Sequence, residues 1–190
     1  IAAGTDFPEF TLQGYEGPFT REDLKGETTI LVFYPFAFSG VCTDQLQIYD
    51  KAWDQLQAAG ATKIYGVSTD AGYSQEAFKE QLGVDIPQLS DFEPKGAVSK
   101  ALGAYFEPAG MTNRAIIIVN PDLTVKFSHL AETPGHMPPV ELLLDGLAGD
   151  PRIRLVRRPV NGGIAAATND ALAAATGELC AFLDHDDTLA

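Results

Sequence analysis

Residues 28–34 (TTILVFY) constrain the fold of this chain more than any other segment. They form an unbroken run of β-branched, aliphatic and aromatic side chains, without the polar alternation of a strand that faces water. Such a run is typical of a central strand in a sheet that is covered on both faces. The segment therefore predicts a buried central strand in a domain of the α/β class.

Strands and helices alternate along the residues before about Gly149. Apolar runs predict strands at 28–34, 63–68, 114–119 and 124–130, the last two joined by the turn sequence Asn120-Pro121-Asp122. Helical spacing predicts helices at 42–59, 73–82 and 138–147, and glycines at positions 60 and 83 close the first two. This order predicts a three-layer α/β sandwich.

The sequence changes character past Gly149. Four of the 13 basic residues crowd into positions 152–158, and alanine then dominates 164–175. We expect a strand at 153–156, a helix that ends near Thr176, and a strand at 179–183. So short a βαβ fragment buries too little surface to be stable alone. We therefore divide the chain into a domain at 1–148 and a segment at 149–190 that is not an autonomous domain.

Charge and composition exclude several classes of partner. The formal net charge of −13 disfavours nucleic acid and anionic membrane surfaces, because both need a basic face on the protein. The apolar runs are far shorter than the roughly 20 residues of a membrane-spanning helix. The sequence does not show the basic segment followed by an apolar segment that is typical of a secretory signal, so we expect none. The two cysteines are too few for a disulfide scaffold, so we expect a reducing, cytoplasmic location.

Cys42 lies in the first turn of an expected helix, directly after a buried strand and a tight turn. Unpaired backbone N–H groups and the positive end of the helix dipole favour the thiolate there. Ser39 can hydrogen-bond to the sulfur or to an oxygen brought to it, and Pro35 covers the pocket with a rigid ring that lacks an N–H donor. Most free cysteines are instead small buried hydrophobes. The position favours a chemical role for Cys42 but does not name a reaction.

The spacing Pro35-x-x-x-Ser39-x-x-Cys42 resembles the P-x-x-x-[T/S]-x-x-C motif of the peroxiredoxins. Further segments resemble the AhpC/TSA group of that family: GTDFPEFTL at 4–12, LSDF at 89–92, and Asn113-Arg114 before an apolar strand and Asn120-Pro121-Asp122. The segment around Cys42 and KGAVS at 95–99 are similar to the short one-cysteine, AhpE-like branch. The resemblance covers residues 1–148. It implies a thioredoxin-like fold, a central mixed sheet flanked by helices, followed here by the short C-terminal βαβ fragment.

The resemblance implies a thiol peroxidase that reduces hydrogen peroxide, organic hydroperoxides or peroxynitrite without a metal or other cofactor. Cys42 would attack the peroxide as a thiolate and become a sulfenic acid. Arg114 would stabilise the thiolate and the charge that develops as the O–O bond lengthens. Ser39 would orient the peroxide, and Pro35 would shield the thiolate from bulk water and over-oxidation. The resemblance also suggests a homodimer.

Two positions depart from common patterns of the family. Gln45 stands where many members carry glutamate; its amide oxygen can accept a hydrogen bond from Arg114 but carries no charge. Gln47 stands where some members carry a resolving cysteine, and Cys180 is the only other cysteine. We therefore expect an external reductant: a low-molecular-weight thiol, a glutaredoxin-like protein or thioredoxin. Cys180 is interpreted as a buried strand residue, with a resolving thiol as the alternative.

The sequence also leaves room for two functions other than a peroxidase. The same domain could be a non-enzymatic redox sensor or docking module, with a slowly reacting cysteine. The segment after Gly149 resembles the nucleotide-sugar half of a family 2 glycosyltransferase, in which Asp184-His185-Asp186-Asp187 would match a metal-binding D-x-D cluster. The first nucleotide-binding strand and the acceptor side of that family have no counterpart here, so we expect this segment to be catalytically idle. The three histidines, at 129, 136 and 185, lack the spacing of metal ligands.

Overall fold

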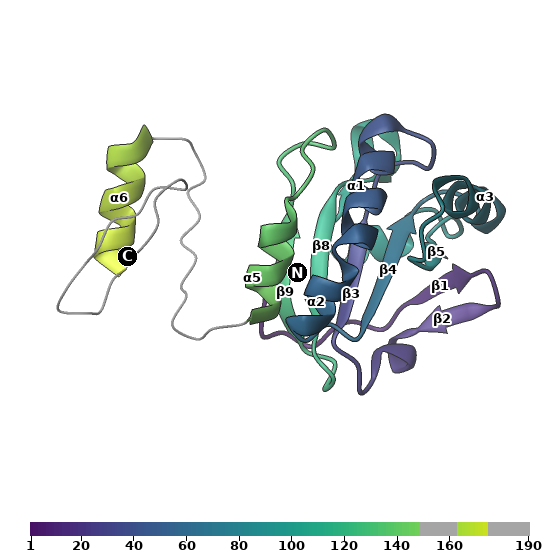
Figure 1. Ribbon diagram of the computed structural model, residues 1–190, viewed down its shortest axis with the longest axis horizontal. Helices are drawn as coiled ribbons and strands as arrows, with labels where there is room; N and C mark the ends of the chain where they lie inside the picture. Colours follow the sequence, from purple (N-terminus) through teal and green to yellow (C-terminus); the bar gives the residue numbers. More distant parts are fainter. Residues whose placement is uncertain (149–162, 175–190) are drawn as a thin grey trace. The chain divides into compact units, whose positions relative to one another are not determined.

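The computed structural model describes residues 1–148 and 163–174 (Figure 1). The chain divides into two compact units, Ile1–Gly149 and Asp150–Ala190. The second is described only for helix α6 (Gly163–Ala174), which lies within the helix expected there. The strands expected at 153–156 and 179–183, the acidic cluster at 184–187 and Cys180 lie outside the described residues. No helix in the described ranges is long and apolar enough to cross a membrane.

A mixed sheet of seven strands forms the centre of residues 1–148, in the order β2-β1-β5-β4-β3-β8-β9 (Figure 1). The strands are β1 (Thr11–Gly14), β2 (Pro18–Thr20), β3 (Thr29–Phe33), β4 (Lys63–Ser68), β5 (Gln88–Ser90), β8 (Ala115–Val119) and β9 (Val125–Leu130). Strand β3 runs parallel to β4 and antiparallel to β8. All five residues of β3 are buried, so the central strand expected from its apolar run is confirmed.

Helices cover both faces of the sheet, as the sequence predicts. They are α1 (Gly40–Lys51), α2 (Trp53–Ala58), α3 (Gly72–Leu82), α4 (Ala97–Ala101) and α5 (Val140–Ala148), with short 3-10 helices η1 (Arg21–Leu24) and η2 (Glu107–Ala109). A small separate ribbon pairs β6 (Tyr105–Phe106) with β7 (Met111–Thr112).

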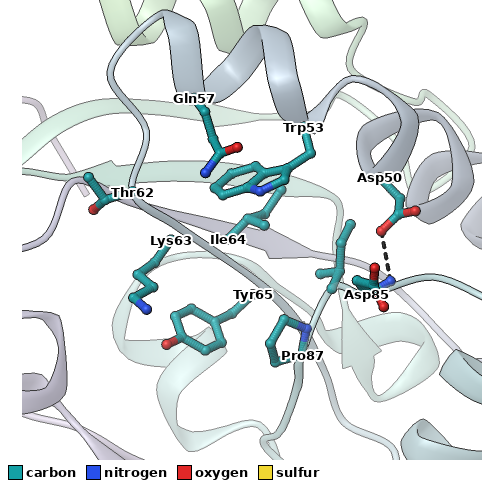
Figure 2. Close-up of a pocket in the computed structure, with 10 residues that line it drawn as sticks. Asp50, Trp53, Gln57, Thr62, Lys63, Ile64, Tyr65, Asp85 and Pro87 are labelled. Atoms are coloured by element: carbon teal, nitrogen blue, oxygen red, sulfur yellow. Dashed lines mark hydrogen bonds between the residues drawn. The ribbon is translucent and has the colours of Figure 1, made fainter.

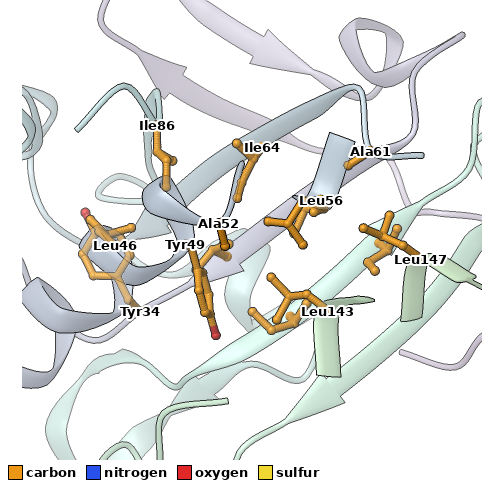
Figure 3. Packing of buried hydrophobic residues seen from close by; sticks show 14 of the residues in the cluster. Tyr34, Leu46, Tyr49, Ala52, Leu56, Ala61, Ile64, Ile86, Leu143 and Leu147 are labelled. Carbon is orange, nitrogen blue, oxygen red and sulfur yellow. The ribbon is translucent and has the colours of Figure 1, made fainter. Parts of the chain in front are cut away.

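Alternate residues of β3 feed two separate cores. Ile30 and Val32 pack with α1, α2 and α5 in a cluster that includes Tyr49, Leu56 and Leu143 (Figure 3). Leu31 and Phe33 point to the other face and pack with residues of η1 and α4. Because successive side chains of a strand point to opposite faces, an all-apolar strand can supply both layers at once.

The prediction of one continuous helix at 42–59 is wrong: the structure has two helices, α1 and α2, which meet at Ala52. Ala52 has φ −86° and ψ 0°, and its carbonyl accepts the amide N–H groups of Gln55 and Leu56 at 3.0 Å. The break leaves Tyr49 and Leu56 on the same buried face, so the apolar spacing looks continuous. Gly60 has φ 105° after α2, which confirms its expected role as a helix-ending glycine.

Candidate active site

Strand β3 ends in a loop that leads directly into α1. Pro35 is buried at the start of this loop, and Phe38 near its end has φ 64°, a left-handed conformation that side chains larger than glycine rarely adopt. Ser39 then takes an extended conformation as the N-cap, and its carbonyl accepts the N–H of Thr43 at 2.9 Å. That is the first intrahelical bond of α1, so the amide of Cys42 precedes the helical hydrogen-bond ladder.

The pairing of β8 with β3 brings Arg114 to Cys42. Phe33 at the end of β3 stands opposite Ala115 at the start of β8, so the residue before Ala115 lies beside the loop that follows Phe33. Arg114 Nη2 donates a hydrogen bond to Cys42 Sγ at 3.3 Å. Cys42 is 0% exposed and Arg114 2% exposed, which places both groups away from bulk water.

The Arg114 guanidinium has neutral oxygen acceptors on its other sides. Nε donates to the Pro134 carbonyl at 2.6 Å, and Nη1 donates to Gln45 Oε1 at 2.5 Å. The latter is the hydrogen bond that the sequence predicts for Gln45. Within residues 1–148, the ion pairs join other groups, and Arg114 has no carboxylate partner. A buried charge needs an opposite charge or strong hydrogen bonds. Cys42 is the neighbouring group that can supply a negative charge.

Tyr49 extends this network one helical turn along α1. Gln45 Nε2 donates to the Tyr49 hydroxyl oxygen at 3.5 Å, and that hydroxyl donates to the Pro138 carbonyl at 2.5 Å. Burial raises the pKa of Tyr49 to about 12, so the phenol remains a proton donor at any physiological pH. The resulting chain orients the Gln45 amide with its oxygen toward Arg114. No sequence pattern predicts this role of Tyr49, because helical spacing does not report the partner of a hydroxyl.

The structure brings two of the four expected site residues into direct contact, Cys42 and Arg114. Pro35 is buried in the preceding loop. Ser39 is half-buried, but its hydroxyl donates to the Phe36 carbonyl at 3.1 Å and neither caps α1 nor bonds the sulfur. Asp70, which accepts the loop amide N–H of Ala37 at 2.8 Å, is absent from the sequence analysis, since no local pattern links it to the loop.

Cys42 does not open onto a large preformed cavity. A pocket of about 330 Å³ lies between α1, α2 and the start of β4, where Trp53, Lys63, Tyr65 and the hydrogen-bonded pair Asp50 and Asp85 line it (Figure 2). None of the four expected site residues belongs to its wall. The buried sulfur instead belongs to the apolar cluster beneath α1. Because Cys42 is fully buried, even a small molecule reaches the sulfur only after some movement of the residues that cover it.

Comparison with known proteins places two family models on the chain. The model of the AhpC/TSA family matches residues 3–128, and the model of glycosyl transferase family 2 matches residues 139–190. The second match begins just before α5, whose Leu143 and Leu147 belong to the core of the first unit.

Curated relatives and solved structures agree with the first match. Alkyl hydroperoxide reductase E of Mycobacterium tuberculosis is 32% identical over 153 residues, which cover 78% of this chain and 97% of that protein. Alkyl hydroperoxide reductase C of Amphibacillus xylanus is 28% identical, over 77% of this chain and 75% of that protein. Reduced Prx3 from Vibrio vulnificus has a TM-score of 0.71 and 25% identity, covering 77% of this chain and 98% of that one. AhpC of Enterococcus faecalis has a TM-score of 0.69 and 24% identity, covering 94% and 98%.

Proposed function

Because the chain belongs to the AhpC/TSA family of peroxiredoxins, we propose that Cys42 is its peroxidatic cysteine and that Arg114 activates it. The fold is the thioredoxin-like fold of the peroxiredoxins, and the protein is an enzyme, a thiol-dependent peroxidase of the kind that its relatives are named for. The roles of individual side chains are our proposal, and the geometry around the sulfur supports it.

The contact between Arg114 and Cys42 carries the proposal. A buried guanidinium lies 3.3 Å from a buried sulfur, and no carboxylate of the described residues neutralises it. The thiolate is the form of Cys42 that compensates this charge. Since the thiolate is the nucleophilic form of cysteine, the same contact that stabilises the ion prepares it for reaction.

The reaction proceeds by displacement at a peroxide oxygen. The Cys42 thiolate attacks the terminal oxygen of ROOH, the O–O bond breaks, and RO⁻ takes up a proton and leaves as ROH, which yields a sulfenic acid. Arg114 donates hydrogen bonds where negative charge develops. Ser39 orients the peroxide once its hydroxyl turns from the Phe36 carbonyl, and Pro35 keeps water from the sulfur. Hydrogen peroxide, organic hydroperoxides and peroxynitrite fit this chemistry.

An external thiol completes the cycle. A thiolate attacks the sulfenic sulfur, water leaves, and a mixed disulfide forms; a second thiol then releases reduced Cys42 and a disulfide. We propose a low-molecular-weight thiol, a glutaredoxin-like protein or thioredoxin in this role, and a cytoplasmic location in which such reductants are maintained. Gln47 supports this choice, because it stands where a nearby resolving cysteine would. Cys180, outside the described residues, is the alternative partner for Cys42.

We also propose a homodimer. Three large apolar side chains, Phe36, Phe38 and Val41, lie within six positions of one another around Cys42 and are 38–52% exposed. Apolar side chains gathered in this way are typical of an interface. The molar mass in solution, measured by light scattering of the eluting peak, tests this proposal; a monomer at micromolar concentration would contradict it.

Residues 149–190 are proposed to be a partial glycosyltransferase-like segment that takes no part in peroxide reduction. The family match at 139–190 supports the origin of the segment. Cys42, Gln45 and Arg114 all lie in the first unit, which supports the proposal that residues 149–190 contribute no residue to peroxide reduction. Manganese-dependent binding of a nucleotide sugar by the full chain would overturn this proposal, and calorimetric titration measures it.

Substitution of Cys42 by serine tests the peroxidase assignment. Serine keeps the size of the side chain and removes the thiolate, so consumption of hydrogen peroxide with dithiothreitol as reductant should fall to the uncatalysed rate. Cys180→Ser is the matched control and should retain the first, peroxide-reducing step. Unchanged consumption by Cys42→Ser would overturn the proposal. Slow reaction of the wild-type protein itself would favour the redox-sensor alternative.

A further inference from the structure

The burial of Cys42 sets two requirements that conflict. Reaction with a small peroxide needs the sulfur held beside Arg114, as it is in the structure, with only enough local movement to admit a molecule little larger than water. Reaction of the sulfenic acid with a reducing thiol needs the same sulfur to be reached by a larger molecule. The loop from Pro35 to Ser39, which leads into α1, must therefore be held firmly but reversibly. The contacts of this loop identify what holds it.

Asp70 holds the loop from the neighbouring strand. It follows β4 (Lys63–Ser68) in the chain, and its Oδ2 accepts the backbone N–H of Ala37 at 2.8 Å. The same oxygen accepts the hydroxyl of Ser68 at 2.7 Å. The Asp70 backbone is fixed in turn, because the Ser90 hydroxyl donates to its carbonyl at 2.6 Å. A carboxylate fixed in this way is a strong acceptor for a loop amide.

The loop itself is under local strain. Phe38, next to Ala37, adopts φ 64°, which disfavours residues with a side chain. Its ring packs on Phe78 of α3 with the centroids 5.1 Å apart, although the side chain is 52% exposed. Residues persist in such conformations only where their surroundings enforce them. The enforcing contacts here are the carboxylate of Asp70 and the ring of Phe78.

We propose that Asp70 is a positioning residue that holds the cysteine loop in its closed, peroxide-reactive arrangement, and that release of its bond to Ala37 admits the reducing thiol to Cys42. The inference rests on the proposed function of Cys42. One carboxylate would then affect both the reaction of Cys42 with peroxide and its later reduction by an external thiol. Asp70 does not touch the reacting atoms, so it acts only through the position of the loop.

Graded substitutions of Asp70 test the proposal in the full-length protein. Asp70→Ala removes the acceptor, whereas Asp70→Asn keeps an acceptor of the same shape but without charge. The first readout is the rate of alkylation of reduced Cys42 by a bulky maleimide, quantified on the Cys42 peptide by mass spectrometry so that Cys180 does not contribute. The second readout is the rate of the first reaction with hydrogen peroxide, measured by rapid mixing.

The two rates are expected to change in opposite directions. Loss of a hydrogen bond to a charged acceptor should raise the alkylation rate of Asp70→Ala by about tenfold or more. Its peroxide rate should fall, because fewer molecules hold Cys42 beside Arg114. Asp70→Asn should lie between the wild type and the alanine variant in both rates. A role in general stability alone would not produce this opposite pair of changes.

Asp23→Ala is the matched control. Asp23 Oδ2 also accepts one backbone N–H and one hydroxyl, both from Thr20, at 2.7 and 2.9 Å, but at the start of η1. This variant should leave both rates unchanged. An unchanged alkylation rate in both Asp70 variants would overturn the proposal, and so would a fall in both rates together. If the alanine variant does not fold, the asparagine variant alone decides. If the wild-type protein does not react with peroxide, the proposed peroxidase function is refuted instead. The alkylation rates would still test whether Asp70 holds the loop closed.

Discussion

Replacement of Arg114 by methionine is expected to slow the first reaction with hydrogen peroxide by about 10²- to 10³-fold, the usual cost of losing one preorganised donor to a developing charge. Nη2 of Arg114 lies 3.3 Å from Cys42 Sγ. Two opposite unit charges at that distance attract by about 5 kcal/mol in an effective dielectric constant of about 20. This attraction acts before the reaction and by itself does not raise the rate. The expected loss of rate corresponds to about 3–4 kcal/mol of separate stabilisation, which Arg114 gives only as the O–O bond lengthens and negative charge develops on the departing oxygen.

Methionine is unbranched and fills the space of the aliphatic part of Arg114 without its guanidinium, so the packing around the sulfur is disturbed less than by alanine. The variant leaves Gln45 Oε1 and the Pro134 carbonyl without their donor, at about 1–3 kcal/mol each. This cost is offset because a guanidinium no longer needs to be buried. The free energy of unfolding should therefore change much less than the rate.

Rapid mixing with excess hydrogen peroxide, followed by the fluorescence of the single tryptophan, Trp53, gives the second-order rate constant directly. Lys63→Met is the control, because it removes the same charge from β4 in the pocket of Figure 2, whose wall does not include Cys42. It should react at the wild-type rate. An unchanged rate constant for Arg114→Met would refute the assignment of Arg114, and an equal loss in both variants would reduce its role to net charge.

Three further predictions follow from the same geometry. Ser39→Ala should lower the peroxide rate by about tenfold with little effect on the melting temperature, because the hydroxyl bonds only the exposed loop carbonyl of Phe36 in the resting protein; an unchanged rate would remove Ser39 from the site. Tyr49→Phe should lower the free energy of unfolding by about 1–3 kcal/mol, because the buried Pro138 carbonyl loses its donor. Since the pKa of Tyr49 is raised to about 12, the unfolded chain loses this proton first, and wild-type stability should fall between about pH 10 and pH 12 more steeply than that of the variant in urea unfolding. Removal of residues 150–190 should leave the peroxide rate unchanged and the melting temperature within a few degrees; a larger fall, seen by calorimetry, would show that the segment stabilises the domain.

The elements that the sequence predicts well are those whose burial is regular. Residues 29–33 are apolar throughout because both faces of β3 are covered, and the hairpin of β8 and β9 follows from two apolar runs around a Pro-Asp turn. Strands β1, β2 and β5 have only three or four residues each, and β2 has no fully buried residue. Such short strands are defined by their hydrogen-bonded neighbours, Ser90 beside Gln13 for example, rather than by a pattern of their own.

The candidate site divides in the same way. Cys42 is marked by its place after an apolar strand and a turn, and Arg114 by its resemblance to a family position. Tyr49 and Asp70 have no local mark, because their roles depend on partners distant in the chain: Pro138 for the first and Ala37 for the second. Contacts of this kind are decided by tertiary packing, and a single sequence does not display them.

Cys42 is proposed to reduce peroxide and to become a sulfenic acid. The most direct measurement mixes the reduced full-length protein with one equivalent of hydrogen peroxide and follows the fluorescence of Trp53, with mass spectrometry of the product. We expect a fast change and one added oxygen atom on the Cys42 peptide. A fast change with the loss of two hydrogens and a peptide that joins Cys42 to Cys180 would replace the external thiol with an internal one. No reaction over minutes, with Cys42 recovered as the free thiol, would show that Cys42 is not a peroxidatic cysteine.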